Sequence, residues 1–139
     1  MKYKILIIDD DINIIETIKR RLVFESNLDV SGVTNPIEGI ELIKNEKIDI
    51  VLTDISMPEM DGITVLRNIK MIDGLTQVII MTGYSSSDKA IECLSLGAND
   101  YILKPFDEMD NVVELINITI DKIIRWKKII IKSGKNIKL

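Results

Sequence analysis

The chain has 139 residues, of which 46% are hydrophobic and 29% charged, and this balance is ordinary for one globular domain. The single cysteine, Cys93, excludes an internal disulfide, and the absence of histidine excludes catalysis that depends on imidazole. No run approaches the roughly 20 apolar residues that span a bilayer, and the N-terminus lacks a signal-peptide pattern. We therefore expect a cytoplasmic protein without membrane insertion, in which Cys93 packs inside a helix interface.

Charge is distributed unevenly along the chain. Residues 1–121 carry 22 acidic and 11 basic side chains, whereas residues 122–139 carry seven basic side chains and no acidic one. We therefore divide the chain into a domain, 1–121, and a basic C-terminal helical extension or linker, 122–139.

Predicted strands and helices alternate five times. Residues 5–8 form a continuous apolar run, which is typical of a strand buried on both faces, and a helix with apolar residues at helical spacing follows to about Glu25. Further strands are predicted at 30–34, 48–53, 77–81 and 100–103, and further helices open at Asn35-Pro36, after Asp61-Gly62, near Ser85 and near Asp107. This alternation predicts an α/β fold with a parallel sheet covered by helices on both faces.

Polar side chains follow four of the predicted strands. Asp9 and Asp10 follow the first strand, Asp54 the third, Thr82 the fourth and Lys104 the fifth. Because the carboxyl ends of parallel strands meet at one edge of a sheet, we expect these groups to lie together. Three neighbouring carboxylates repel unless a cation lies between them, and oxygen ligands are those that Mg²⁺ requires. The hydroxyl and the ammonium would bind an oxyanion, so the set predicts phosphoryl transfer with Asp54 as nucleophile.

Each of these groups has a simpler interpretation when it is taken alone. Asp11, next to the pair, is better explained as a helix N-cap, Thr82 is able to cap a helix, and most lysines such as Lys104 are solvated. The chain contains no GxxxxGK[ST] loop and no GxSxG elbow, so the motifs of nucleotide cradling and of α/β-hydrolases are missing. The joint placement of the groups is what points to a site.

Four segments, IIDDD, VLTDISMPEMDG, IIMTGYSS and ANDYILKPF, resemble the successive signature segments of the bacterial two-component response-regulator receiver domain of the chemotaxis-regulator type. The resemblance covers about residues 3–121. It implies a flavodoxin-like, doubly wound (βα)5 fold with a five-stranded parallel sheet of order 2-1-3-4-5. It also implies a signalling domain that promotes only its own phosphorylation and dephosphorylation, rather than an enzyme.

The resemblance assigns the acidic residues to phosphorylation and to metal binding. Asp54 would be the phosphoacceptor. Mg²⁺ would be held by Asp9, Asp10, Asp54 and the backbone carbonyl of Ser56.

The same resemblance assigns the remaining site residues. Thr82 and Lys104 would hold the phosphoryl oxygens, and Thr82 would act with Tyr101 as a switch in which the ring turns inward. An aromatic residue at the position of Tyr101 is also common in a core. Ser56 and Tyr84 fall at positions that tune the lifetime of the aspartyl phosphate.

The resemblance also implies partners: a sensor histidine kinase or phosphotransfer protein as donor, and a downstream protein or output domain contacted through the fourth helix, fifth strand and fifth helix. Two other functions stay open. A phosphatase or phosphotransferase with aspartyl-phosphate chemistry usually has an acid two residues after the nucleophile, where this chain has Ser56. A binding module that is never phosphorylated would fit a chain that had lost an acidic, threonine or lysine site residue, and all are present here.

The last helix is expected to extend beyond the domain. The apolar residues that keep helical spacing are Ile116, Ile120, Ile123 and Ile130. One alternative is that they form the seam of a homodimer, and another is that the tail is a linker to an output domain. Trp126 and residues 129–131 would pack on a partner, form such a seam or dock back on the domain. Because no helix-turn-helix follows, we expect no direct nucleic-acid binding by this segment.

Overall fold

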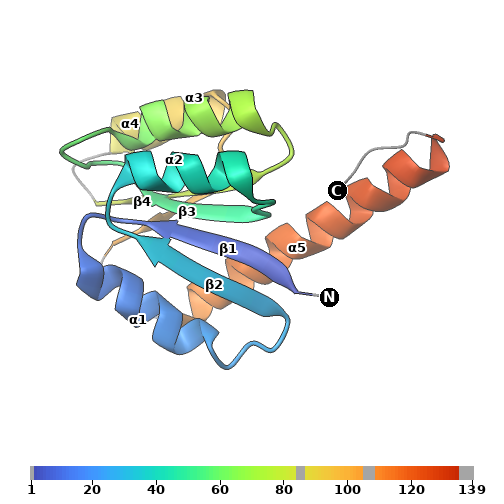
Figure 1. The fold of residues 1–139 in the computed structure, drawn as a ribbon, viewed down its shortest axis with the longest axis horizontal. Coiled ribbons are helices and arrows are strands. Elements are labelled where there is room, and N and C mark those ends of the chain that lie inside the picture. Colours follow the sequence, from blue (N-terminus) through green and yellow to red (C-terminus); the bar gives the residue numbers. More distant parts are fainter. Residues whose placement is uncertain (1, 84–86, 105–108, 135–139) are drawn as a thin grey trace.

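In the described residues, the protein consists of a five-stranded, wholly parallel sheet and five helices (Figure 1). The computed structural model describes residues 2–83, 87–104 and 109–134. The strands are β1 (Tyr3–Ile8), β2 (Leu28–Val33), β3 (Ile50–Asp54), β4 (Gln77–Thr82) and β5 (Asp100–Leu103). The helices are α1 (Ile12–Leu22), α2 (Pro36–Asn45), α3 (Gly62–Ile72), α4 (Ser87–Ser95) and α5 (Met109–Lys132). The sheet order is β2-β1-β3-β4-β5, which confirms the predicted flavodoxin-like, doubly wound fold.

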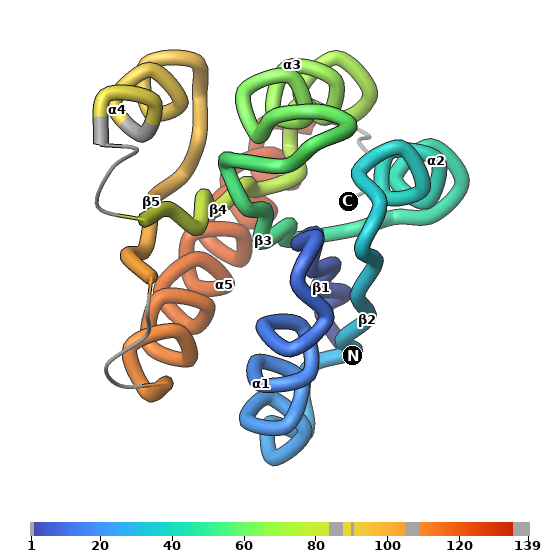
Figure 2. Tube along the Cα trace, turned by 90° about the vertical axis from the view of Figure 1, so that its left-hand side faces the viewer, coloured from blue at the N-terminus to red at the C-terminus, as the bar shows by residue number. Residues whose placement is uncertain are grey.

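Helices cover both faces of the sheet. Figures 1 and 2 show α1 and α5 on one face and α2, α3 and α4 on the other. In β1, Ile5 and Ile7 pack in the cluster under α1 and α5, whereas Leu6 and Ile8 pack in the cluster under the other three helices. This double burial explains why the strand is a continuous apolar run without polar alternation. Cys93 of α4 is fully buried in the second cluster, as predicted.

Two predicted strands are one residue longer at their carboxyl ends. Asp54 is the last residue of β3 and pairs in register with Met81, and Thr82 is the last residue of β4 and pairs with Leu103. The backbone therefore holds these two polar residues in the sheet itself. The predicted ends were 53 and 81, because Asp54 and Thr82 were interpreted as the polar residues that follow each strand.

Helix α1 is shorter than predicted. It ends at Leu22 rather than near Glu25, and Val23 and Phe24 are 73% and 79% exposed. These two side chains have no core to cover beyond the last buried turn, so packing does not stabilise a longer helix.

Short polar caps fix where the helices begin. The side chains of Asp11, Asn35 and Asp61 accept hydrogen bonds from backbone N–H groups in the first turns of α1, α2 and α3, as the sequence predicted for Asp11. Gly97, after α4, has φ of +104°, which confirms the predicted glycine stop. The predicted start of α4 near Ser85 lies outside the described residues.

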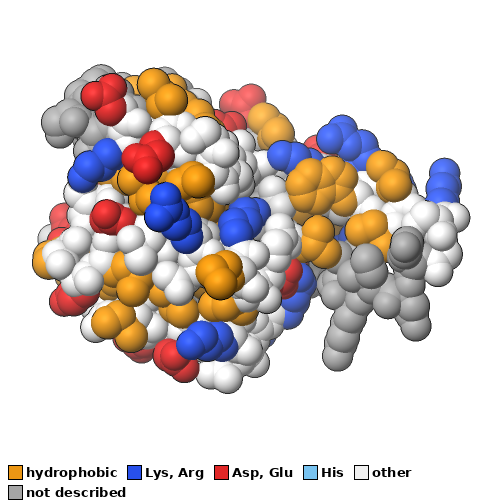
Figure 3. All heavy atoms as spheres, turned by 90° about the horizontal axis from the view of Figure 1, so that it is seen from above, with side chains coloured by type: hydrophobic (Ala, Val, Ile, Leu, Met, Phe, Trp, Pro, Cys, Tyr) orange, Lys and Arg blue, Asp and Glu red, His pale blue; other side chains and the backbone are white. Residues whose placement is uncertain are grey.

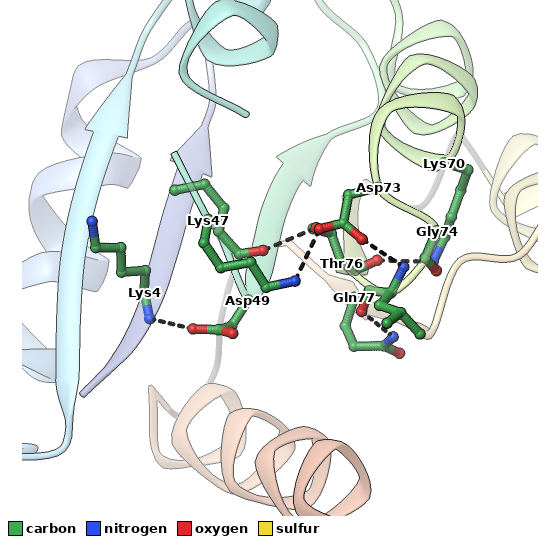
Figure 4. Close-up of polar contacts among 10 residues, drawn as sticks. Lys4, Lys47, Asp49, Lys70, Asp73, Gly74, Thr76 and Gln77 are labelled. Carbon is green, nitrogen blue, oxygen red and sulfur yellow. Dashed lines mark hydrogen bonds and ion pairs between the residues drawn. The ribbon is translucent and has the colours of Figure 1, made fainter. Parts of the chain in front are cut away.

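The amino ends of the strands are tied together by polar contacts (Figure 4). The backbone N–H of Lys4 donates to Asp49 at 2.9 Å, the ammonium of Lys47 donates to Asp73 at 2.9 Å, and Lys70 donates to the Thr76 carbonyl at 2.8 Å. The first contact joins β1 to the loop before β3, the second joins that loop to the one after α3, and the third joins α3 to the loop before β4. This edge of the sheet is therefore structural.

Helix α5 runs beyond the sheet. Ile116, Ile120 and Ile123 are buried in the core of their own chain, so the predicted dimer seam is wrong for these three residues. The sequence pattern could not separate a stripe that packs on the sheet from one that packs on a partner. Ile130 is only partly buried.

The first turns of the extension dock back on the domain. The Lys122 ammonium donates to Asn99 Oδ1 at 2.5 Å and lies 5.0 Å from the centre of the Trp126 ring. The Lys127 ammonium lies 5.5 Å from the centre of the Tyr3 ring. Trp126 also lines a small pocket with Asp49 and other residues at the amino edge of the sheet. None of the helices in the described ranges has the combination of length and apolarity that crossing a bilayer requires.

Candidate functional site

The three aspartates after β1 have three different surroundings. Asp9 is completely buried, and its Oδ1 accepts a hydrogen bond from the Asp11 backbone N–H at 2.9 Å. Asp10 is exposed, and Asp11 caps α1 by accepting from the Asn13 N–H at 2.9 Å. Asp9 and Asp10 therefore belong to the site, whereas Asp11 serves as a helix cap. The sequence predicted this division.

Asp54 lies beside this pair because β3 is the neighbour of β1. Asp54 is 8% exposed, and its Oδ1 accepts a hydrogen bond from the backbone N–H of Ser56 at 3.4 Å. β1 lies between β2 and β3, so the chain changes direction across the sheet at this point. Ligands of doubly wound sheets bind at such switch points, outside the carboxyl ends of the strands.

Lys104 brings a cation to both buried carboxylates. Its Nζ is 2.6 Å from Asp9 Oδ2 and 3.3 Å from Asp54 Oδ2, and its side chain is 20% exposed. Its backbone N–H donates to the Thr82 carbonyl at 2.7 Å, which fixes the residue directly after β5 beside the end of β4. The sequence placed Lys104 in the site but did not predict this ion pair.

Burial and charge shift the pKa values of Asp9 and Lys104 in opposite directions. Burial raises the pKa of the Asp9 carboxyl above its ordinary value, and the hydrogen bond from Lys104 offsets only part of that rise. Burial alone would lower the pKa of the Lys104 ammonium, but the hydrogen bond to Asp9 and the two carboxylate charges outweigh it and raise the pKa. Lys104 therefore stays charged at neutral pH.

The acidic residues fit a hard cation. One carboxylate oxygen each from Asp9, Asp10 and Asp54 lie within 4.8 Å of one another. Opposite ligands of an octahedral Mg²⁺ ion lie about 4.2 Å apart, since each oxygen is about 2.1 Å from the metal. The spacing and the all-oxygen donor set thus match Mg²⁺ after a small closing movement.

Of the other predicted residues, Ser56 contacts Asp54 through its backbone N–H, and the Thr82 hydroxyl is bonded elsewhere. Thr82 is buried, and its hydroxyl donates to the Gly83 carbonyl at 3.1 Å. Tyr101 lies on β5 in register with Ile80 and is 43% exposed. Ser56 is exposed, two residues after Asp54. Tyr84 lies outside the described residues.

Gly62 is a residue whose role at the site the sequence analysis missed. A Cβ there would lie 2.6 Å from Ile55 Cα and 2.7 Å from the Asp54 carbonyl oxygen, and its N–H donates to the Ile55 carbonyl at 2.8 Å. The loop after β3 can therefore return against the backbone of Asp54 only because residue 62 has no side chain. The Asp61-Gly62 pair signalled a turn, but not this approach.

The fold and the acidic switch-point site define a doubly wound α/β protein with the layout of a phosphoryl-accepting signalling domain. Residues 5–117 match the response regulator receiver domain family. The chain is 38% identical over 121 residues to the chemotaxis protein CheY of Bacillus subtilis (strain 168), covering 87% of this chain and all of that protein. It is 43% identical over 103 residues to the transcriptional regulatory protein ZraR of Klebsiella oxytoca, covering 74% of this chain but only 23% of ZraR.

Solved structures agree with the sequence relatives. A CheY-like receiver domain protein from Methanospirillum hungatei JF-1 superposes with a TM-score of 0.84 at 31% identity, over 90% of this chain and 98% of that one. A receiver domain protein from Clostridium thermocellum gives 0.79 at 34% identity, over 92% and 98%. The chain therefore belongs to the response-regulator receiver domains, the phosphorylation-based signalling domains of two-component systems.

Proposed function

We propose that this receiver accepts a phosphoryl group on Asp54 in a Mg²⁺-dependent reaction, from a sensor histidine kinase or a phosphotransfer protein. The observation that carries the proposal is the position of the Lys104 ammonium, 2.6 Å from Asp9 and 3.3 Å from Asp54, at the edge where three carboxylates meet. A phosphoryl group on Asp54 would meet this ammonium directly.

The chemistry follows from the positions of the groups. An Asp54 carboxylate oxygen attacks phosphorus, the P–N bond of the phosphohistidine breaks, and its electron pair stays on the departing imidazole nitrogen. Bound Mg²⁺ would neutralise charge on the transferring phosphoryl oxygens, and Asp9, Asp10, Asp54 and the Ser56 carbonyl would hold it. Lys104 would exchange its contact with Asp54 for one with the phosphoryl group while keeping Asp9.

Mass spectrometry of the intact protein with acetyl phosphate tests the assignment. We expect one added phosphoryl group in Mg²⁺, none in excess chelator and none in Asp54→Asn. Glu59→Gln, an exposed carboxylate of the same loop, is the matched control and should be labelled like the unchanged protein. Undiminished labelling of Asp54→Asn would refute the assignment.

The output would come from a movement of Thr82 and Tyr101. The Thr82 hydroxyl contacts a backbone carbonyl and the Tyr101 ring is half exposed, which suits the resting state of a switch. Phosphate contacts made by Thr82 and Lys104 act on the ends of β4 and β5, and thus on the face formed by α4, β5 and α5. A downstream protein or an output domain would read this face. We propose that the chain acts in the cytoplasm as a signalling domain and turns over no external substrate.

A variant separates labelling from switching. Thr82→Val should still be phosphorylated on Asp54, since the nucleophile and the acidic residues are intact. Its amide NMR signals in β5 and α5 should move much less on addition of beryllofluoride, an acyl-phosphate mimic, than those of the unchanged protein. Full-size shifts in Thr82→Val would remove Thr82 from the switch.

A further inference from the structure

Helix α5 carries a second stripe, on the side that faces away from the sheet. Its members, spaced three or four residues apart and all exposed, are Glu114, Ile118, Asp121, Arg125, Ile129 and Lys132. This spacing puts them on one side of the helix. Ile118 and Ile129 are 56% and 59% exposed, so two large apolar side chains face solvent among four charges.

The charges along this outer stripe are segregated. Glu114 and Asp121 lie in the first half of the helix, and Arg125 and Lys132 lie in the second. Within the described parts of the chain, none of these four side chains forms an ion pair.

Three other charges of the helix already have contacts inside the monomer, whereas Lys128 is exposed. Asp110 pairs with Arg21 at 3.0 Å, Lys122 contacts Asn99, and Lys127 lies over the ring of Tyr3. The outer stripe therefore holds complementary charges that its own chain leaves exposed. Figure 1 shows the basic half projecting beyond the rest of the domain, and Figure 3 shows basic and hydrophobic side chains on the projecting part.

We propose that the outer stripe of α5 binds the same stripe of a second copy of this chain, in antiparallel orientation. With Ile118 of one copy opposite Ile129 of the other, Glu114 comes beside Lys132 and Asp121 beside Arg125. Two-fold symmetry makes each contact twice. A parallel pair would instead place Glu114 against Glu114 and Lys132 against Lys132, so the charges select the antiparallel arrangement.

The geometry of the monomer leaves room for this pair. The segment from 114 to 132 is about 28 Å long at about 1.5 Å per residue, and its buried stripe, including Ile116 and Ile120, faces the sheet. The two domains then lie on opposite sides of the helix pair and do not compete for space. A nucleic acid or an anionic membrane would use only the basic half and would leave Glu114 and Asp121 without a role.

Charge reversal with rescue tests the pair. In sedimentation at micromolar concentrations and low salt, we expect the unchanged chain to dimerise. Glu114→Lys with Asp121→Lys should raise the dissociation constant of the dimer at least about tenfold, and so should Arg125→Glu with Lys132→Glu. An equimolar mixture of the two double variants should restore a dimer, because every pair is again complementary. A monomeric unchanged chain, or no rescue in the mixture, would overturn the proposal.

Two matched substitutions of apolar residues distinguish binding through the outer stripe from nonspecific hydrophobic association. Ile129→Ser should weaken the dimer, whereas Ile131→Ser should not, although Ile131 is more exposed at 72%, because it lies on another side of the helix. Equal effects of the two substitutions would contradict the stripe. Asp54→Asn should dimerise like the unchanged chain, so the outcome is independent of the proposed phosphorylation.

Disulfide trapping tests the orientation. Ile118→Cys mixed with Ile129→Cys should form a crosslinked dimer on mild oxidation, and neither variant should do so alone. The native Cys93 is fully buried and does not interfere. Crosslinking of either variant with itself would show a parallel pair and refute the antiparallel register.

Discussion

Asp9 is held in the folded protein at an energetic cost. Because burial raises the pKa of its carboxyl in the folded state, the folded chain binds this proton more tightly than the unfolded chain does. The ionised carboxylate therefore destabilises the fold. This destabilisation is absent below the pKa of the unfolded chain, grows between the two pKa values, and is complete above the pKa of the folded chain.

Asp9→Asn should consequently stabilise the protein at pH 7 in a chelator, by on the order of 1 kcal/mol. The stabilisation should shrink as the pH is lowered to 4, because the raised pKa makes the folded chain take up the Asp9 proton at a higher pH than the unfolded chain does. Urea unfolding at both pH values measures it, and Asp10→Asn, at the exposed neighbour, should have a smaller effect. A destabilised Asp9→Asn at pH 7 would mean that the ion pair with Lys104 outweighs burial.

Gly62 gives a prediction about the loop after Asp54. Gly62→Ala should destabilise the protein by about 2 kcal/mol, because its Cβ would meet backbone atoms at 2.6 and 2.7 Å that cannot move aside. Gly74→Ala is the matched control, since the atom nearest to its Cβ would be 3.8 Å away, and it should change stability by less than about 0.5 kcal/mol. Urea unfolding of both variants decides whether the close approach is real.

At the level of single residues, the sequence predicted which groups meet but not how they meet. Strand ends fix the positions of Asp9, Asp54 and Lys104, and parallel strands bring such ends together whatever the side-chain rotamers are. The contact of Lys104 with Asp9 and the outward Tyr101 ring depend on rotamers and on local packing, which no periodicity encodes.

At the scale of elements, the order of strands and helices was predictable, because the strands contain apolar runs, the helices keep apolar residues at helical spacing, and α1, α2 and α3 begin at polar caps. The boundaries of the strands and helices were less predictable. Helix α1 ends early where Val23 and Phe24 lose contact with the core, and the sheet continues through Asp54 and Thr82 because ladder hydrogen bonds do not require apolar side chains. The apolar stripe of α5 was mistaken for a partner interface because a sheet face and a second helix demand the same period.

The proposed end of the domain at residue 121 falls inside α5, and truncation tests where the folding unit ends. A chain cut after Asp121 loses Ile123, which is buried in the core, and Trp126, which is partly buried. We expect it to be less stable than a chain cut after Lys128 by about 2 to 4 kcal/mol. Urea unfolding compares the two, and both lack Ile129 and Lys132, so dimerisation does not affect the difference. Equal stabilities would place the end of the folding unit at 121.

At the scale of the whole molecule, the two edges of the sheet have different tasks. The amino edge is closed by contacts such as Lys4 with Asp49 and Lys47 with Asp73, whereas the carboxyl edge collects charges that repel one another. The stable edge and the packed faces keep the carboxylates of Asp9 and Asp54 close together despite their repulsion. Helix α5 links these regions, since it begins at Met109, five residues after Lys104, and passes the amino edge, where Trp126 and Asp49 line one pocket.

The central claim is that Asp54, among the clustered carboxylates, is the residue that receives the phosphoryl group. Reduction of the acyl phosphate with borohydride converts the modified aspartate to homoserine, which peptide mass spectrometry locates in the sequence. After reaction with acetyl phosphate and Mg²⁺, we predict homoserine at position 54 and unchanged aspartate at positions 9 and 10. Homoserine at position 9 or 10, or at none of the three in a protein that has gained phosphate, would contradict the account.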